Sequence, residues 1–175
     1  MRLVLISAFF LTIGFNVAFA ADIPVDCEKY ANNDRVCLAC NIYYEARNQS
    51  EPGQYAVAHV TINRIKSAKY PDTICKVVWE TRRHYKTKKL TPMFSWTLDG
   101  KSDVVQNAVA WRRALTVADA VLSSLKAGMN FDITYGATHY HADYVKPAWA
   151  KAFTLTNVIG HHLFYTEPVQ TAKVQ

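Results

Sequence analysis

Glu45 is the residue whose type and setting point most directly to chemistry. At about 100° per residue, Leu38 and Ile42 share its side of a helix, and the apolar arc lies just beyond. A partly desolvated carboxyl group keeps its proton closer to neutral pH, and it can then protonate a glycosidic oxygen as a general acid. The alternative is a boundary glutamate that pairs with an arginine, such as Arg47 or Arg64.

Two helices must position this carboxylate. Asp34 can cap a helix that runs to about Gln49. Ser50 to Gly53 is a break with Pro and Gly, after which residues 54–68 form a helix that is apolar nearly all round. Such a helix belongs in the middle of a domain.

The remaining segments predict a mainly α (α+β) fold, with a helical body and a small β/loop region in the C-terminal half. We expect a short third helix opening at Pro71-Asp72, a basic surface loop over 81–91, an extended piece over 93–100, a long helix over 104–126, and loops with short strands beyond it.

The N-terminus indicates export. Arg2 precedes an apolar run that ends in Ala18-Phe19-Ala20, as in a secretory signal peptide cleaved after Ala20. An uncleaved anchor is the alternative, because the run is near the spanning minimum of about 17 residues. Without Arg2 the chain keeps 19 basic and 14 acidic residues. This charge suits an anionic wall or membrane surface. Nucleic acid is the weaker partner, because export removes the protein from it.

The four cysteines predict two disulfides in an oxidising compartment, and three connectivities are possible. Cys37 and Cys40 lie three residues apart on a predicted helix and point in a similar direction. Each should therefore pair elsewhere, and we favour Cys37 with Cys75 and Cys27 with Cys40. A zinc site at Cys37-x-x-Cys40 is the competing interpretation.

The histidines raise the question of a metal. His139, His141 and the pair His161-His162 could supply zinc ligands, but only Asp143 is close by as an acidic ligand. We favour histidines that brace loops through hydrogen bonds, and we expect no metal and no cofactor.

Several motifs occur in order along the chain. They are Asn41–Gln54 (NIYYEARNQSEPGQ), Ala56-Val57-Ala58, Asn63-Arg64, Tyr70–Cys75 (YPDTIC), Phe94-Ser95-Trp96, Gly136–His141 (GATHYH), Pro147-Ala148-Trp149 and Ile159–Tyr165 (IGHHLFY). Over about residues 36–165 the chain resembles the SleB-type cell wall hydrolases, the spore cortex-lytic enzymes and their bacterial and phage relatives.

The resemblance implies a lysozyme-like fold and cleavage between N-acetylmuramic acid and N-acetylglucosamine in peptidoglycan. It also implies that Glu45, the glutamate of the E-A-R motif, is the catalytic acid. Several members of the family are regarded as lytic transglycosylases, which form a 1,6-anhydro product.

Two positions depart from the family pattern. Gln49 replaces a common second glutamate and cannot act as a base, and Met93 stands where relatives commonly have Gln. An inverting hydrolase needs a second carboxylate about 6.5–9.5 Å from the first. The candidates that remain have no motif behind them: Glu51, Glu80, Asp99, Asp103 and Asp143. A route with Glu45 as the only essential carboxylate, acting as acid and then as base on the sugar's own 6-hydroxyl, fits better.

Aromatic residues in turn-rich segments could stack on sugar faces. We expect Trp96 and Tyr140 to contact substrate most directly, and the other predicted substrate-binding residues are Phe94, Ser95, Gln49 and Trp149. The alternative is that most of these rings belong to the core.

The sequence thus predicts four segments: a signal peptide (1–20), an N-terminal extension (21–34), a catalytic domain (35–166) and a flexible tail (167–175). The predicted activity is an exported glycosidase, a lytic transglycosylase acting on peptidoglycan glycan strands. A zinc-dependent wall amidase using His139, His141 and His161, or a non-catalytic wall-binding module, are the alternatives.

Overall fold

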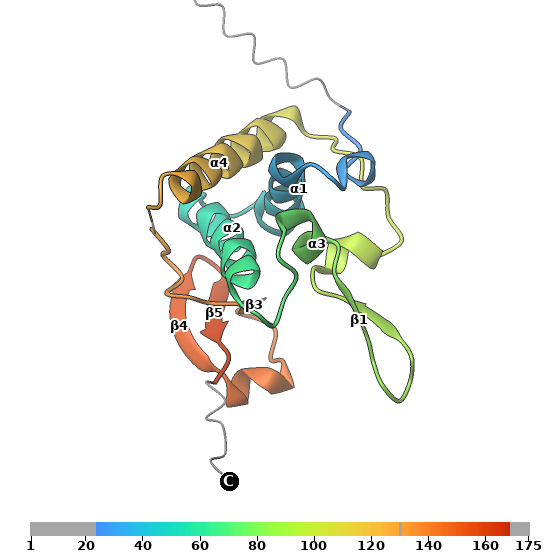
Figure 1. Cartoon of the computed structure of the whole chain (residues 1–175), viewed down its shortest axis with the longest axis vertical. Coiled ribbons are helices and arrows are strands. Elements are labelled where there is room, and N and C mark those ends of the chain that lie inside the picture. The colour runs from blue at the N-terminus through green and yellow to red at the C-terminus, as the bar shows by residue number, and fades with distance from the viewer. Residues whose placement is uncertain (1–23, 130, 169–175) are drawn as a thin grey trace, which may run out of the picture.

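A helical body and two small antiparallel sheets make up the part of the protein that the computed structural model describes, residues 24–129 and 131–168 (Figure 1). The helices of this part of the chain are α1 (Asp34–Ala46), α2 (Glu51–Lys66), α3 (Ile74–Val78) and α4 (Ala108–Lys126). Short 3-10 helices occupy Glu28–Tyr30 (η1), Ser95–Leu98 (η2) and Ala148–Ala152 (η3). The strands are β1 (Thr81–Arg83), β2 (Leu90–Pro92), β3 (His139–Ala142), β4 (Thr154–Ile159) and β5 (His162–Thr166). The predicted α+β class is confirmed.

The ends of the first two helices differ from the prediction. Asn33, and not Asp34, caps α1, because its side chain accepts a hydrogen bond from the Val36 amide. The Asp34 carboxylate instead accepts a hydrogen bond from the Cys75 amide and ties α1 to α3. The first helix also ends at Ala46, three residues early, and α2 already begins at Glu51 with Pro52 in its first turn.

Helix α2 lies in the middle of the fold, as its apolar surface predicted. Ala56, Val57 and Val60 are fully buried, and α2 packs against α1, α3 and α4. The largest core side chains, which include Tyr43 on α1 and Trp111 on α4, fill the space between these helices. The last turn of α1 is therefore held on a rigid support.

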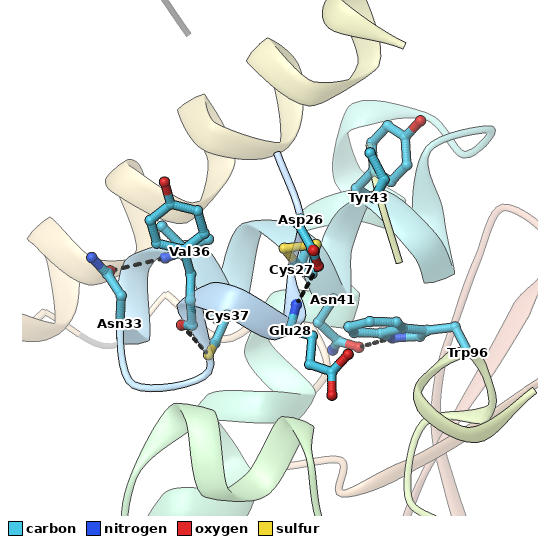
Figure 2. The surroundings of a disulfide bond; sticks show 12 residues. Asp26, Cys27, Glu28, Asn33, Val36, Cys37, Asn41, Tyr43 and Trp96 are labelled. Atoms are coloured by element: carbon cyan, nitrogen blue, oxygen red, sulfur yellow. Dashed lines mark hydrogen bonds between the residues drawn. A yellow bond between two sulfur atoms is a disulfide. The ribbon is translucent and has the colours of Figure 1, made fainter. Parts of the chain in front are cut away.

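Two disulfides fix the N-terminal segment and α3 to α1. Cys27 is joined to Cys40, and Cys37 to Cys75, which are the pairs that the sequence favoured. Figure 2 shows the surroundings of one of these bonds beside α1. Because all four sulfurs are in disulfides, the zinc interpretation of Cys37-x-x-Cys40 is wrong. Asp26, within the predicted N-terminal extension 21–34, also forms a β-bridge with Val104.

Sequence patterns misassigned two neighbouring segments, the hairpin and the 3-10 helix that follows it. The segment 81–91, expected as an irregular surface loop, belongs to a hairpin of the antiparallel strands β1 and β2. Both strands are exposed apart from Pro92, so no apolar alternation marks them. Residues 95–98, expected as an extended piece, form η2. The long helix begins at Ala108 and not at Val104, because the Asn107 side chain caps it.

The C-terminal sheet has the strand order β3-β5-β4, and both pairings are antiparallel. Tyr140 lies opposite Phe164 in the register, on the face that packs against Ala56 and Val60 of α2. Side chains alternate along a strand, so His139 and His141 lie on the opposite face. The sheet therefore presents Tyr140 to the helical body.

The predicted signal peptide and residues 169–175 of the predicted tail lie outside the described residues. Within the described part of the chain, no helix has both the length and the apolar character that a membrane crossing requires.

Candidate active site

Glu45 lies in the last turn of α1, at the wall of a cavity of about 450 Å³. Besides Glu45, the lining includes Tyr44 and Arg47 from the same region, Ser95 and Trp96 from η2, and the segment 99–106. The side chain is partly buried, so one part of the carboxyl group meets protein and another the cavity. This is the setting that the sequence predicted for Glu45.

A tyrosine from the sheet holds the carboxylate. The Tyr140 hydroxyl donates a hydrogen bond to Glu45 Oε2 over 2.9 Å, although the two residues are 95 positions apart in the chain. Burial, together with the nearby negative charge of Glu45, raises the pKa of Tyr140 well above its ordinary value. The phenol therefore stays protonated and remains a donor.

Burial sets the acidity of Glu45. Desolvation raises its pKa above the ordinary value of 4.5, while the Tyr140 hydroxyl, the charge of Arg64 and a backbone hydrogen bond from Ser95 each lower it. The net direction is upward, because desolvation is the largest of these effects. A carboxyl group with this balance suits proton donation.

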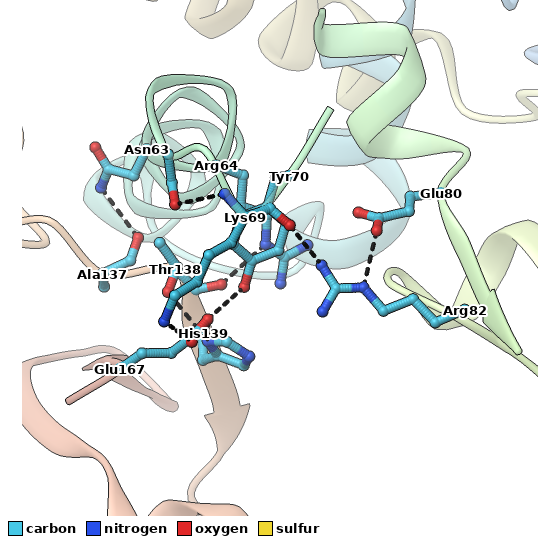
Figure 3. Close-up of polar contacts among 11 residues, drawn as sticks. Asn63, Arg64, Lys69, Tyr70, Glu80, Arg82, Ala137, Thr138, His139 and Glu167 are labelled. Atoms are coloured by element: carbon cyan, nitrogen blue, oxygen red, sulfur yellow. Dashed lines mark hydrogen bonds and ion pairs between the residues drawn. The ribbon is translucent and has the colours of Figure 1, made fainter. Parts of the chain in front are cut away.

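Arg64 is a buried cation behind the carboxylate. Only 4% of its surface is exposed, and its Nε donates a hydrogen bond to the Thr138 carbonyl over 2.9 Å. Its guanidinium lies 4.6 Å from the centre of the Phe94 ring. Figure 3 shows Arg64 between α2 and the residues at the start of β3. The ion pairs among the described residues do not include Arg64 with Glu45, so the salt bridge that would oppose the acid role is not formed.

The structure separates the two aromatic residues of the Phe94-Ser95-Trp96 motif. Phe94 is 2% exposed, and its ring packs against the Arg64 guanidinium. Trp96 lines the Glu45 cavity but is 6% exposed, because its ring stacks on Tyr44 and its Nε1 donates to Asn41 Oδ1 (Figure 2). Ser95 is exposed and lines the same cavity as Glu45.

The other predicted contacts lie in different places. Trp149 packs against His139, His141 and Tyr165 on the outer face of the sheet, the face opposite to Tyr140. It is therefore not part of the Glu45 cavity. Gln49 lies in a neighbouring cavity, where its Oε1 accepts a hydrogen bond from the His161 amide.

The remaining carboxylates divide into two groups. Asp99 and Asp103 line the same cavity as Glu45. Burial, with the charges of Asp99, Glu28 and Asp26 nearby, raises the pKa of Asp103. The others are placed elsewhere: Glu51 lines the cavity of Gln49, Glu80 pairs with Arg82, and Asp143 pairs with His161.

The histidines have structural partners. His139 contacts Trp149 and Phe153, and desolvation lowers its pKa to about 4. His141 bonds to the Tyr165 hydroxyl through Nε2. Over residues 24–129 and 131–168, no three side chains of His, Cys, Asp or Glu come together in a group that could hold a metal ion.

Sequence reasoning missed two residues that shape the site. Asn41 is fully buried and links Thr61 of α2 to Trp96, while Tyr44 supports the Trp96 ring. A polar residue within the apolar side of a predicted helix was the available signal for Asn41. Tyr44 had no such signal, because its partner is 52 residues away in sequence.

The fold and motifs define a class of protein. The chain belongs to the Cell Wall Hydrolase family, whose profile matches residues 48–165, two thirds of its length. Glu45 lies just before this range. The helices and small sheets match those of the solved relatives described below.

Particular relatives are spore cortex-lytic enzymes. That of Halalkalibacterium halodurans is 29% identical over 150 residues, which are 85% of this chain and 38% of the relative. That of Oceanobacillus iheyensis is 30% identical over 136 residues, which are 77% of this chain and 42% of the relative. The chain thus spans about two fifths of the length of these relatives.

A solved structure covers the same domain. The catalytic domain of the germination-specific lytic transglycosylase SleB from Bacillus anthracis is 27% identical, with a TM-score of 0.55. The match covers 77% of this chain and 94% of that one.

Proposed function

We propose that the protein cleaves peptidoglycan at the bond between N-acetylmuramic acid and N-acetylglucosamine, as an exported lytic transglycosylase with Glu45 as general acid and then general base. The observation that carries the proposal is the partly buried Glu45 at a cavity wall, with a raised pKa and a hydrogen bond from Tyr140. Family membership and the SleB-like fold support it.

The chemistry follows from the protonation state. Protonated Glu45 gives its proton to the glycosidic oxygen, the bond between this oxygen and the anomeric carbon breaks, and the sugar on the oxygen leaves as an alcohol. Glu45 remains as a carboxylate, which the Tyr140 hydrogen bond and the Arg64 charge stabilise. The carboxylate then takes the proton of the sugar's 6-hydroxyl as that oxygen attacks the anomeric carbon. The attacking group is already part of the substrate, so proximity replaces an activated water. This step returns the proton to Glu45.

Asp103 gives a specific reason to test a second chemistry. It lines the Glu45 cavity, and its raised pKa would make it a stronger base than an ordinary aspartate. If Asp103 activated water, the product would carry a reducing end without the anhydro ring. Hydrolysis is therefore the second candidate function.

Mass spectrometry of the released muropeptides tests both. Wild type should release 1,6-anhydro ends from purified peptidoglycan, Glu45→Gln should lower the rate by about a thousandfold or more, and Asp103→Asn should keep most of the rate. Reducing ends that disappear in Asp103→Asn would establish the hydrolytic route. Full activity of Glu45→Gln would remove Glu45 from the mechanism.

A further inference from the structure

The cavity of Glu45 is the first of three that adjoin. A second cavity of about 430 Å³ shares Tyr43, Arg47 and Gln106 with it. A third, of about 570 Å³, shares Val109 and Arg113 with the second. The three together form a trough that leads from Glu45 to the N-terminal ends of α2 and α4.

Positive charge lines the part of the trough beyond Glu45. Arg47 and Arg113 line the second cavity, and Arg112 and Arg113 line the third. All three arginines are exposed, and the ion pairs among the described residues include none of them. By contrast, Arg35 and Arg82 are each paired with a carboxylate. The trough thus presents three guanidinium groups that are available to a ligand.

The first cavity carries both signs, because Lys101 and Arg47 line it together with carboxylates, and Lys101 pairs with Asp99. Asp99 and Asp103 lie in the first cavity, whereas Glu51 is the acidic residue that lines the third. Arg47 is also held in place, since its guanidinium lies 5.1 Å from the centre of the Tyr43 ring. A ligand placed along the trough would therefore have its anionic groups beyond the cleavage point, on the side of α4.

The chemistry of the substrate suggests what these groups are. Hydroxyl and acetamido groups of a glycan carry no charge and do not require guanidinium partners. Peptide substituents on the muramic acid carry carboxylates, which match the planar fork of arginine in two parallel hydrogen bonds. A row of arginines beside a glycan-cleaving centre is thus suited to peptide-bearing strands.

We propose that the trough binds the carboxylates of the peptide substituents of the glycan, with Arg112 and Arg113 as binding residues that give preference for peptide-bearing strands. The inference rests on the proposed function for the identity of the ligand. It extends that function from the bond that is cleaved to the substituents that are recognised.

The test compares soluble glycan strands that carry their peptides with strands stripped by amidase treatment, in which the lactyl carboxyl groups that the amidase exposes are then converted to uncharged amides. Binding is measured by calorimetry in Glu45→Gln, so that strands stay intact. We expect peptide-bearing strands to bind about tenfold more tightly, and Arg112→Gln/Arg113→Gln in the same background to remove that preference. The affinity for stripped strands should fall less than twofold in Arg112→Gln/Arg113→Gln. Arg112→Lys/Arg113→Lys should keep part of the preference, because it keeps charge without the fork.

The control is Lys146→Gln/Lys151→Gln, which removes the same charge from exposed positions outside the trough. It should leave the preference intact. The inference would be overturned if the arginine variant lost equal affinity for both kinds of strand, or if the lysine control lost as much preference as the arginine variant. Net charge alone would then explain binding. Failure of the proposed function has another signature: wild type would release no fragments from either kind of strand, whatever the dissociation constants.

Discussion

The helical body and the C-terminal sheet contribute different parts of one site. The body supplies the carboxylate of Glu45 and the buried surroundings that raise its pKa. The sheet supplies the Tyr140 hydroxyl, which holds the carboxylate and lowers its pKa, and the adjoining Thr138 supplies the carbonyl that binds Arg64. The helical body therefore sets the position of Glu45, and the sheet adjusts its pKa.

The two faces of β3 extend this contrast. Tyr140 points to the helical body, whereas His139 and His141 lie under Trp149 on the outer face. One face of the strand thus serves the site and the other stabilises the sheet. The difference between neighbouring residues follows from strand alternation alone.

Removal of Arg64 should break the connection between the regions most severely. Arg64→Ala would leave a cavity beside Phe94 and leave the Thr138 carbonyl without its partner. We expect a loss of about 3 kcal/mol, or roughly 6–12 °C in Tm, measured by thermal unfolding with circular dichroism. Arg112→Ala, at an exposed position of α4, should stay within about 0.5 kcal/mol. An unchanged Tm for Arg64→Ala would show that other contacts join the regions.

Removal of the Tyr140 hydroxyl should show what the sheet contributes to the site, because this hydroxyl acts on the pKa and on the orientation of the Glu45 carboxyl group. Without the hydrogen bond, the pKa of Glu45 should rise further, since the phenol stabilises the ionised form. A general acid works while protonated, so the alkaline limb of the pH–rate profile should move to higher pH in Tyr140→Phe. The maximal rate should fall about tenfold as the carboxyl group loses its orientation.

Tyr144→Phe is the matched control for that measurement, because Tyr144 is 84% exposed. Its pH profile should equal that of wild type. A Tyr140→Phe profile whose alkaline limb moves to lower pH would contradict the assigned role of the hydroxyl.

The smallest effect concerns the stability of the body itself. The pKa of Glu45 is raised in the folded state, so the ionised carboxylate opposes folding. The protonated carboxyl group is the form that the folded state favours. Its contribution to stability is complete below the ordinary pKa of 4.5 and is lost as pH rises through the folded-state pKa of Glu45. Glu45→Gln should therefore be more stable than wild type at pH 8, by about 1 kcal/mol or 3 °C.

Thermal unfolding between pH 3 and pH 8 would measure that difference, which should disappear at the acidic end. Glu28→Gln, at an exposed position, should follow wild type throughout. A glutamine variant less stable than wild type at pH 8 would mean that hydrogen bonds to the carboxylate outweigh its burial.

Sequence patterns foresaw the elements whose signals are local. The apolar surface of α2 predicted its central position, and cysteines three residues apart on a helix favoured the observed pairing. The β1–β2 hairpin and η2 gave no such signal, because the former is exposed along nearly its whole length and the latter is one turn long. Local rules fail where neither face of a segment is buried.

The features of the site also divide into those set by neighbouring residues and those set by distant ones. The position of Glu45 at the edge of an apolar helix face is a property of residues within two helical turns, so the sequence alone determined it. The hydrogen bond from Tyr140, the buried charge of Arg64 and the burial of Phe94 join residues from distant parts of the chain. Only the packing of the sheet onto α2 determines these contacts. They matter because the pKa of Glu45 depends on every charge and dipole nearby, whatever its place in the sequence.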